Sequence, residues 1–202
     1  MASGLRERKK LKTKSAIQRE AIRLFLEQGY EDTTVEQIAD AAEISPSTFF
    51  NYFSSKEDVV YQDELDPLIL AAFNAEPRDE HPIAAMRHAM DGVFRKLTPE
   101  QDRIMRQRIA LMSSTPSLRA AMLARFADMV DEIAGLVATR AGGSAKDFAV
   151  RNMAGALLGV MMSTLITMAE DPGADLLAAA DEAMAHLEAG LPLDWSSTRR
   201  KR

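Results

Sequence analysis

The segment from Thr33 to Lys56 constrains the fold of this chain more than any other stretch. Thr33 and Thr34 each precede a Glu or Gln by three residues, the spacing of a helix-capping box, so either threonine suits the start of a short helix. Ser45 followed by Pro46 supplies a second cap and a proline at the first helical position, where a missing N–H costs nothing. The segment therefore predicts two short helices joined by a tight turn.

The second of these helices has two faces of different chemistry. Phe49 and Phe53 lie four residues apart and form its packing face. The remaining side chains are small, hydroxyl-bearing or aromatic, and such a surface suits the major groove of DNA. The same pattern also fits an ordinary helical hairpin without a DNA-binding role.

More residues agree with a DNA-binding role than a bare two-helix pattern requires. They are Gly29, Glu31-Asp32, Thr33-Thr34, Ile38-Ala39, Ser45-Pro46-Ser47-Thr48, Phe49-Phe50, Tyr52-Phe53 and Ser55-Lys56-Glu57-Asp58. In this order they closely resemble the N-terminal domain of the TetR family of transcriptional regulators, over roughly residues 10–62. The resemblance implies a DNA-binding surface made of Thr34, Ser45, Pro46, Ser47, Thr48, Phe50, Asn51, Tyr52 and Lys56.

The resemblance also implies different roles within this surface. The residues that follow Ser45 would enter the major groove, whereas Thr34, Tyr52 and Lys56 would hold phosphates. Two positions depart from the family pattern. A glutamate, Glu43, stands where the turn glycine is usual and is expected to adopt a positive φ. Phe50 stands where a tyrosine is common and would contact a thymine methyl group instead of a phosphate.

Charge is unevenly distributed along the 202 residues. The net charge is −5, yet residues 1–23 hold eight Lys and Arg against two acids. We expect residues 1–9 to be a disordered basic arm that follows the phosphate backbone or remains in solvent. Residues 191–202, which end in Arg-Arg-Lys-Arg, are expected to be a disordered basic tail.

Helical periodicity continues to the end of the chain. Proline and glycine separate expected helices at about 13–28, 56–66, 82–97, 99–113, 117–141, 145–170 and 174–189. The predicted fold is all-α with about nine helices: a helix-turn-helix head at 10–55 and a larger helical ligand-binding and dimerisation domain at 56–190. No uninterrupted run of 18 apolar residues occurs, so we expect neither a membrane span nor a secretory signal, and a cytoplasmic protein.

The larger domain is rich in methionine, a side chain that fills irregular gaps and adapts to guests. Eleven of the 12 methionines lie beyond residue 80. Core packing explains many of them, but together they favour an apolar pocket. The expected lining is Met90, Phe94, Met105, Ile109, Met112, Met122, Phe126, Met129, Met153, Leu157 and Met161. Arg106, Arg108 and Arg119 are expected at its mouth, in solvent or paired with acids. The stretches SPSTFFNYF and SKEDVVYQDELDPLI resemble the TetR subgroup that senses acyl-CoA-like ligands.

Small residues recur every four positions on the 145–170 helix, and they would let a second helix approach closely. We expect a homodimer interface made of Gly155, Gly159, Ser163, Leu177 and Met184, or alternatively packing of the same residues within one chain. The chain has no cysteine, and its three histidines lie at no metal-ligand spacing. We expect no catalytic residue, metal or cofactor.

The sequence therefore predicts a ligand-responsive, DNA-binding repressor that a small apolar or acyl-type effector releases from a palindromic double-stranded operator. The alternative is a DNA-binding regulator with a solid core that is controlled by a protein partner or is constitutive. An enzyme is the least favoured class, since no phosphate-binding loop or nucleophile motif is present.

Overall fold

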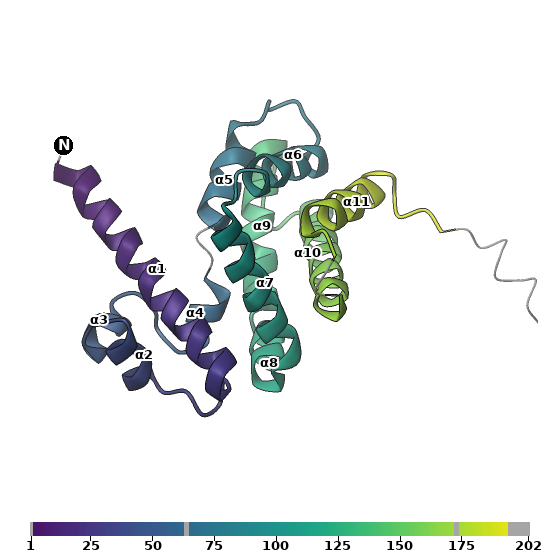
Figure 1. Cartoon of the computed structure of the whole chain (residues 1–202). Coiled ribbons are helices and arrows are strands. Elements are labelled where there is room, and N and C mark those ends of the chain that lie inside the picture. The colour runs from purple at the N-terminus through teal and green to yellow at the C-terminus, as the bar shows by residue number, and fades with distance from the viewer. Residues whose placement is uncertain (1, 63–64, 172–173, 194–202) are drawn as a thin grey trace, which may run out of the picture. The chain divides into compact units, whose positions relative to one another are not determined.

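A computed structural model describes residues 2–62, 65–171 and 174–193, and this part of the chain contains eleven helices and no strand (Figure 1). The all-α prediction is confirmed. The helices are α1 (Ala2–Gln28), α2 (Val35–Ala41), α3 (Pro46–Phe50), α4 (Asp58–Tyr61), α5 (Leu65–Ala75), α6 (Pro82–Phe94), α7 (Pro99–Ser114), α8 (Pro116–Ala124), α9 (Phe126–Ala141), α10 (Phe148–Glu170) and α11 (Leu176–Glu188).

The helices form two compact units, and each unit combines two separate stretches of the chain. The first unit comprises Met1–Leu68 and Leu97–Ala124, and the second comprises Ile69–Lys96 and Arg125–Arg202. Helices α7 and α8 thus belong with the helix-turn-helix head. The reason is hydrophobic: Leu111 of α7 and Leu118 of α8 are buried in the same cluster as the core of the head.

The core of the first unit is aromatic at its centre. Phe25, Phe49 and Phe53 are each at most 2% exposed, and Ile17 and Ile38 are fully buried beside them. The rings of Phe49 and Phe53 lie with their centroids 5.8 Å apart. Burying such rings removes a large apolar area from water, which holds the short α2 and α3 against α1.

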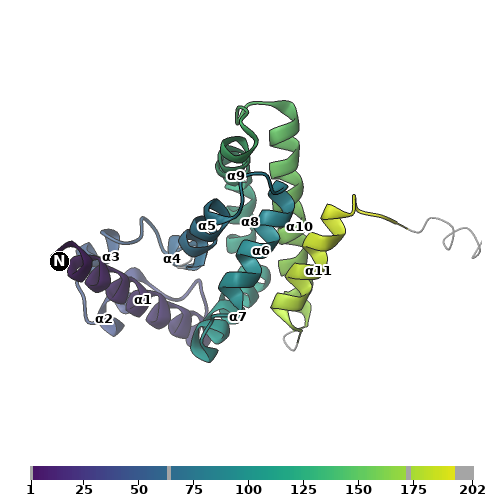
Figure 2. The same cartoon turned by 90° about the horizontal axis from the view of Figure 1, so that it is seen from above.

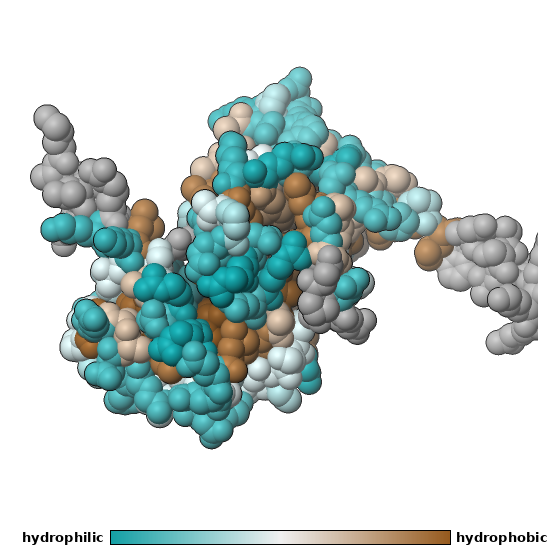
Figure 3. All heavy atoms as spheres, in the orientation of Figure 1, coloured by the Kyte–Doolittle hydropathy of each residue, from teal (hydrophilic) through white to brown (hydrophobic). Residues whose placement is uncertain are grey.

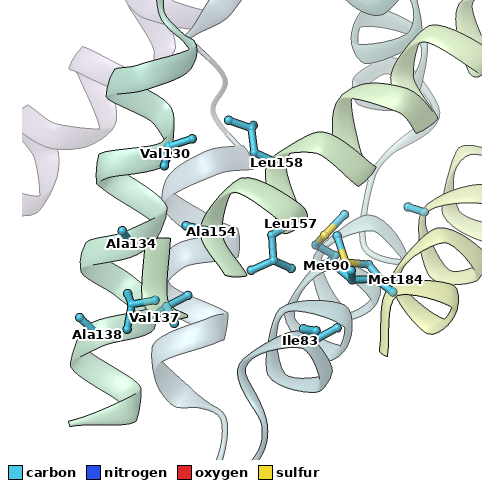
Figure 4. Packing of buried hydrophobic residues seen from close by; sticks show 13 residues of the cluster. Ile83, Met90, Val130, Ala134, Val137, Ala138, Ala154, Leu157, Leu158 and Met184 are labelled. Carbon is cyan, nitrogen blue, oxygen red and sulfur yellow. The ribbon is translucent and has the colours of Figure 1, made fainter. Parts of the chain in front are cut away.

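The core of the second unit is aliphatic. Its main cluster combines side chains of α6, α9, α10 and α11, the last two of which run side by side in Figure 2. Figure 4 shows Met90 of α6 beside Met184 of α11, with Leu157 of α10 in the same cluster. Ala134 and Ala154 are fully buried and let α9 and α10 pack closely. On the face shown in Figure 3, hydrophilic side chains predominate and hydrophobic ones form separate patches.

Three predicted segments differ from the structure. The residues expected as a disordered arm are helical from Ala2 onward, because no helix-breaking proline lies between them and the packed part of α1. The helix expected at 56–66 is represented by the four-residue α4 and by the first two residues of α5, and residues 63 and 64 between them lie outside the described part of the chain. The helix expected at 117–141 is divided at Arg125 into α8 and α9. Of the expected tail, Leu191–Leu193 is exposed coil, and 194–202 lies outside the described residues.

Candidate nucleic-acid interface

The capping box of α2 decides between the two threonines. The Thr34 hydroxyl accepts a hydrogen bond from the Gln37 N–H at 3.2 Å, and the Gln37 side-chain oxygen accepts one from the Thr34 N–H at 2.9 Å. Thr34 is therefore the cap, and its side chain is exposed. Thr33 is 1% exposed, and its hydroxyl donates to the Gly29 carbonyl oxygen at 2.7 Å, which holds the preceding turn.

The turn after α2 adopts the left-handed conformation expected at Glu43, whose φ is 54°. The Glu43 N–H donates to the Asp40 carbonyl and the Ile44 N–H donates to the Ala39 carbonyl, at 3.0 and 2.9 Å. These two bonds form a Schellman motif, in which the residue at the position of Glu43 is usually glycine. The motif fixes the direction in which the chain enters α3.

The position of α3 follows from its N-terminal cap and from the buried ring of Phe49. The Ser45 hydroxyl accepts a hydrogen bond from the Thr48 N–H at 3.1 Å, and Pro46 occupies the first turn, as predicted. Because Phe49 faces the core, the neighbouring Phe50 must point away from it and is 55% exposed. Phe50 shares this outward surface with the exposed side chains of Ser45, Pro46, Ser47 and Asn51, and with the half-buried Thr48.

Lys56 is bound to the backbone of its own unit. Its ammonium group donates to the carbonyl oxygens of Tyr30, Thr33 and Glu31 at 2.6, 2.9 and 3.5 Å, and lies 4.2 Å from the centroid of the Tyr30 ring. Through these hydrogen bonds Lys56 holds the turn that precedes Thr34. The Tyr30 ring in this turn is buried, and burial raises the pKa of its hydroxyl. Tyr52 is half-buried against the aromatic core.

The cations of α1 differ in their surroundings. Lys9, Lys10 and Lys12 are exposed. Arg19 and Arg23 further along the helix form ion pairs with Glu20, so their charge is partly neutralised. The basic character of the N-terminal segment is thus concentrated in the early turns of α1.

Side chains of α1 and α7 hold the short α4 by its carbonyl groups. The Gln18 amide donates to the Val59 and Gln62 carbonyl oxygens at 2.8 and 2.7 Å, and Arg108 donates to the Val60 carbonyl oxygen at 2.9 Å. Arg108 is 6% exposed, so the expectation that it lies in solvent or at a pocket mouth is wrong. Sequence periodicity indicated only that α7 has an apolar face, and gave no sign of this partner.

The first turn of α8 contacts the head at two further points. The Tyr61 hydroxyl donates to the Leu118 carbonyl oxygen, and the Ser117 hydroxyl donates to a Glu31 carboxylate oxygen at 2.5 Å. Together with Arg108, these contacts connect α7 and α8 to α4 and to the turn before α2. Any rearrangement of α7 or α8 would therefore act on the head directly.

The eleven residues predicted to line a pocket are divided between the units. Met105, Ile109, Met112 and Met122 lie on α7 and α8, and Met112 packs against the aromatic core. The other seven lie in the second unit and belong to its main cluster or pack against it. Two of these seven, Met90 and Phe94, also line a recess between α6 and α11.

This recess has an empty volume of about 190 Å³, part of it open to solvent. Its lining is Arg87, Met90, Asp91, Phe94, Leu177, Ala180, Asp181 and Met184. Arg87 spans the two helices, since its guanidinium donates to both carboxylate oxygens of Asp181 at 2.5 and 3.1 Å. The hydrogen bond from Arg87 lowers the pKa of the Asp181 carboxyl group.

The residues predicted for a dimer interface also separate into two groups. Gly159 and Ser163 of α10 are exposed. Apart from the adjoining residues and the backbone of α10 itself, no atom of the described residues lies within 4 Å of where a Cβ would stand on Gly155 or Gly159. Met184, in contrast, is 1% exposed and faces the core of its own chain, and Leu177 lines the recess. Met184 is therefore removed from the expected interface, because its side of α11 packs on α6 and α10.

Helix α10 combines apolar composition with low burial. Its segment Phe148–Thr167 has a mean hydropathy of 1.4, and 28% of it is buried. By length and composition alone this segment is apolar enough to cross a membrane, a test that core helices of other proteins also pass. The segment is not an uninterrupted apolar run, since Arg151 and Asn152 lie within it, and a single helix of this kind is weak evidence for a membrane span. Phe148 and Ile166 are 85% and 49% exposed.

The structure contains a helix-turn-helix whose two helices are both capped, and the other described elements are helices as well. These features together define the class of helix-turn-helix transcriptional regulators. The family model described as "Bacterial regulatory proteins, tetR family" matches residues 17–61, and the model described as "MftR C-terminal domain" matches residues 80–192. The chain belongs to the TetR family of transcriptional regulators.

Individual relatives agree with this assignment. The chain is 39% identical over 146 residues to the HTH-type transcriptional regulator TcmR of Streptomyces glaucescens, a match that covers 69% of this chain and 65% of TcmR. It is 30% identical over 177 residues to the putative mycofactocin biosynthesis transcriptional regulator MftR of Mycobacterium tuberculosis, covering 85% and 87% of the two chains. Both relatives are named as regulators and neither as an enzyme.

Solved structures share the fold. FadR of Thermus thermophilus, a TetR-family repressor in complex with lauroyl-CoA, matches with a TM-score of 0.54 and 24% identity, covering 89% of this chain and 95% of FadR. A putative TetR-family regulator of Syntrophomonas wolfei matches with a TM-score of 0.61 and 17% identity, covering 91% and 98%. At these identities the likeness supports the helical architecture alone.

Proposed function

We propose that this TetR-family regulator is a homodimeric, ligand-responsive repressor that acts in the cytoplasm and leaves a near-palindromic operator when a small apolar or acyl-type effector binds. The observation that carries the DNA-binding part is the outward surface of α3. A phenyl ring, Phe50, is 55% exposed there among hydroxyl and amide groups, while its neighbour Phe49 is fully buried. One edge contact ties the Phe50 ring to Phe49, with centroids 5.4 Å apart, and the exposed remainder of the ring suits contact with a thymine methyl group.

The surrounding side chains contact different parts of the DNA. Ser45, Pro46, Ser47, Thr48, Phe50 and Asn51 contact base edges and the adjoining backbone in the major groove, and Thr34 and Tyr52 contact phosphates. Lys56 contributes positive charge and, by holding the carbonyl groups of Tyr30 and Thr33, places Thr34 against the phosphate backbone. Exposed Lys9, Lys10 and Lys12 extend this positive surface along α1.

Dimerisation uses the exposed apolar face of α10. Gly155 and Gly159 offer open space at their Cα atoms, Ser163 is small, and Ile166 is half exposed near them. A two-fold axis at this face would pack α10 against its copy and bring two heads to one operator, with recognition helices about 34–36 Å apart or a multiple of that distance.

The effector acts through α7 and α8. Arg108, Ser117 and the Leu118 carbonyl group bind α4 and the turn before α2. An effector that stabilises a different arrangement of α7 would therefore shift the heads to a spacing that fits the operator less well. The lauroyl-CoA in the FadR structure supports an acyl-type effector as the first class to test.

The recess between α6 and α11 favours a second candidate function. The space inside it that a water-sized sphere can occupy is only about 10 Å³, room for about one water molecule and far below the roughly 300–1,000 Å³ of ordinary ligand pockets. A solid-core regulator that answers to a protein partner, or is constitutive, would need no larger space. Thermal unfolding across a panel of acyl and aromatic compounds separates the two: an effector raises the midpoint, whereas a solid core shows no shift with any compound.

DNA selected from random sequence with the full-length protein would test the proposal, followed by fluorescence anisotropy on the selected duplex. Phe50→Ala should weaken binding to the selected sequence by about tenfold to a hundredfold and change random-sequence DNA binding little, because a base contact is lost. Leu123→Ala is the matched control, since Leu123 is an exposed apolar side chain on α8. Equal affinities of Phe50→Ala and the parent protein for the selected duplex would remove α3 as the reading helix.

A further inference from the structure

Two carboxylates and one imidazole converge where the α5–α6 connection meets α6. Glu76 follows the end of α5, Glu80 lies in the connection and His88 lies in α6, and one potential ligand atom of each falls within 4.8 Å of the others. The His88 Nδ1 atom lies 2.8 Å from the Glu80 Oε1 atom. All three residues belong to the second unit, so their arrangement does not depend on the head.

The second oxygen of Glu80 marks this cluster as more than a surface ion pair. Its Oε2 atom is buried and accepts no hydrogen bond from the described part of the chain. A buried carboxylate oxygen without a donor or cation costs free energy, so it calls for a positively charged partner. The Glu76 carboxylate is half-buried beside it, and the His88 side chain is 58% exposed, which leaves a path from solvent.

Arg140 of α9 holds the backbone that carries the two glutamates. Its guanidinium donates to the carbonyl oxygens of Phe73, Glu76, Pro77 and Glu80, and it lies over the Phe73 ring at 4.6 Å. The charge of Arg140 is thus directed to main-chain oxygens, and the two carboxylates remain available to another cation. A connection fixed in this way presents its side chains as a preorganised set.

We propose that Glu76, Glu80 and His88 form a binding site for a divalent transition-metal ion of the Zn²⁺ type, completed by water. One imidazole nitrogen with two carboxylate oxygens is a donor set that favours such ions over Mg²⁺ or Ca²⁺, which prefer oxygen ligands alone. Tetrahedral Zn²⁺ with bonds of about 2.0–2.1 Å places its ligand atoms about 3.3 Å apart. Small side-chain rotations bring atoms within 4.8 Å to that separation.

The bound ion would join the end of α5 to the middle of α6. Binding that is specific to the folded state stabilises that state, so saturation with metal should raise the thermal midpoint of the second unit. The site is separate from the α3 surface, and its loss leaves the DNA-binding proposal intact.

The test uses the full-length protein after treatment with a chelator and removal of that chelator. Zn²⁺ is then titrated in competition with a chromophoric chelator, with Mg²⁺ as the comparison ion, and Co²⁺ is used to record the absorption of its coordination sphere. We expect one Zn²⁺ per chain, no competition from millimolar Mg²⁺, and a Co²⁺ spectrum typical of nitrogen and oxygen ligands.

Three variants and one control locate the ion. His88→Ala, Glu80→Gln and Glu76→Gln should each weaken Zn²⁺ binding by at least about tenfold and abolish the midpoint shift caused by Zn²⁺. His186→Ala removes an exposed histidine of α11 and should change neither. Binding of less than one ion per chain, or an affinity that His186→Ala reduces as much as His88→Ala does, would overturn the site and leave His88 and Glu80 as an ion pair only.

Discussion

The two units of this regulator are stabilised in different ways. In the first unit, α3 and α4 have five and four residues, too few to persist without support, and they depend on caps, on side chains bound to backbone carbonyls and on an aromatic core. In the second unit the helices have up to 23 residues, and its main cluster contains only aliphatic side chains and methionine. The first arrangement fixes one surface, whereas we expect the second to tolerate repacking, because methionine side chains adapt to irregular gaps.

The largest expected effect is the loss of an aromatic core residue in the head. Phe49→Ala should lower the free energy of unfolding by about 3–5 kcal/mol and abolish DNA binding, because the ring that positions α3 is removed. Met184→Ala in the second unit should cost about 2–5 kcal/mol, nearer the lower end because methionine neighbours repack. Denaturant titrations followed by circular dichroism measure both. If Phe49→Ala still binds the operator, the Phe49 ring is not what positions α3 for DNA binding.

A smaller effect is expected where α7 holds α4. Arg108→Ala should lower the free energy of unfolding by about 1–3 kcal/mol, since the buried Val60 carbonyl oxygen loses its donor. Arg106→Ala is the control on the same helix: its pair with Asp102 is partly exposed and should contribute less than about 1 kcal/mol. An equal decrease in the free energy of unfolding in the two variants would show that the hydrogen bond from Arg108 to α4 stabilises the fold no more than an exposed ion pair does.

A substitution in the turn between α2 and α3 should stabilise the protein. Glu43→Gly is expected to raise the free energy of unfolding by about 0.5–1 kcal/mol, because glycine adopts a φ of 54° without the strain that a Cβ introduces. Glu43→Ala keeps the Cβ and should leave the thermal midpoint nearly unchanged. Thermal unfolding of the three proteins decides, and a midpoint that falls in Glu43→Gly would show that the glutamate side chain has a stabilising contact.

The smallest effect concerns the ion pair between α6 and α11. Arg87 lowers the pKa of Asp181, so the pair stabilises the folded chain above the unfolded pKa of about 3.9 and this contribution is lost as the pH falls through the lower, folded pKa. The side chains are 31% and 42% exposed, so solvent screening limits the contribution to less than about 1 kcal/mol. Arg87→Gln should reduce the midpoint at pH 7 and flatten its decrease below pH 4. Lys146 is an exposed cation in the connection between α9 and α10, so Lys146→Gln is the control and should leave the acid dependence of the midpoint unchanged.

The head was predictable in detail because its signals are local. The caps at Thr34 and Ser45, the positive φ at Glu43 and the inward position of Phe49 and Phe53 all depend on residues within about four positions of each other. The choice between Thr33 and Thr34 also depends on a local contact, since the Thr33 hydroxyl is bound to the Gly29 carbonyl four residues before it. The capping-box spacing is the same for both threonines, so that spacing gave no sign of this bond.

The grouping of helices was not predictable by the same means. The predicted domain at 56–190 contains α7 and α8, as does the region of the C-terminal family model at 80–192, whereas the burial of Leu111 and Leu118 in the core of the head was not foreseen. An apolar helix face shows that a helix is packed but does not show which partner covers it. For the same reason the sequence expected Met184 at a dimer surface, whereas its own chain buries it.

An all-α fold with a capped recognition helix follows from local sequence patterns, because helix boundaries and turns depend on neighbouring residues. The packing of the helices was needed to show that Lys56 and Arg108 bind backbone carbonyls, and that Glu76, Glu80 and His88 meet. Their partners are supplied by elements brought together when helices pack, and the spacing of residues along the chain carries little information about such meetings.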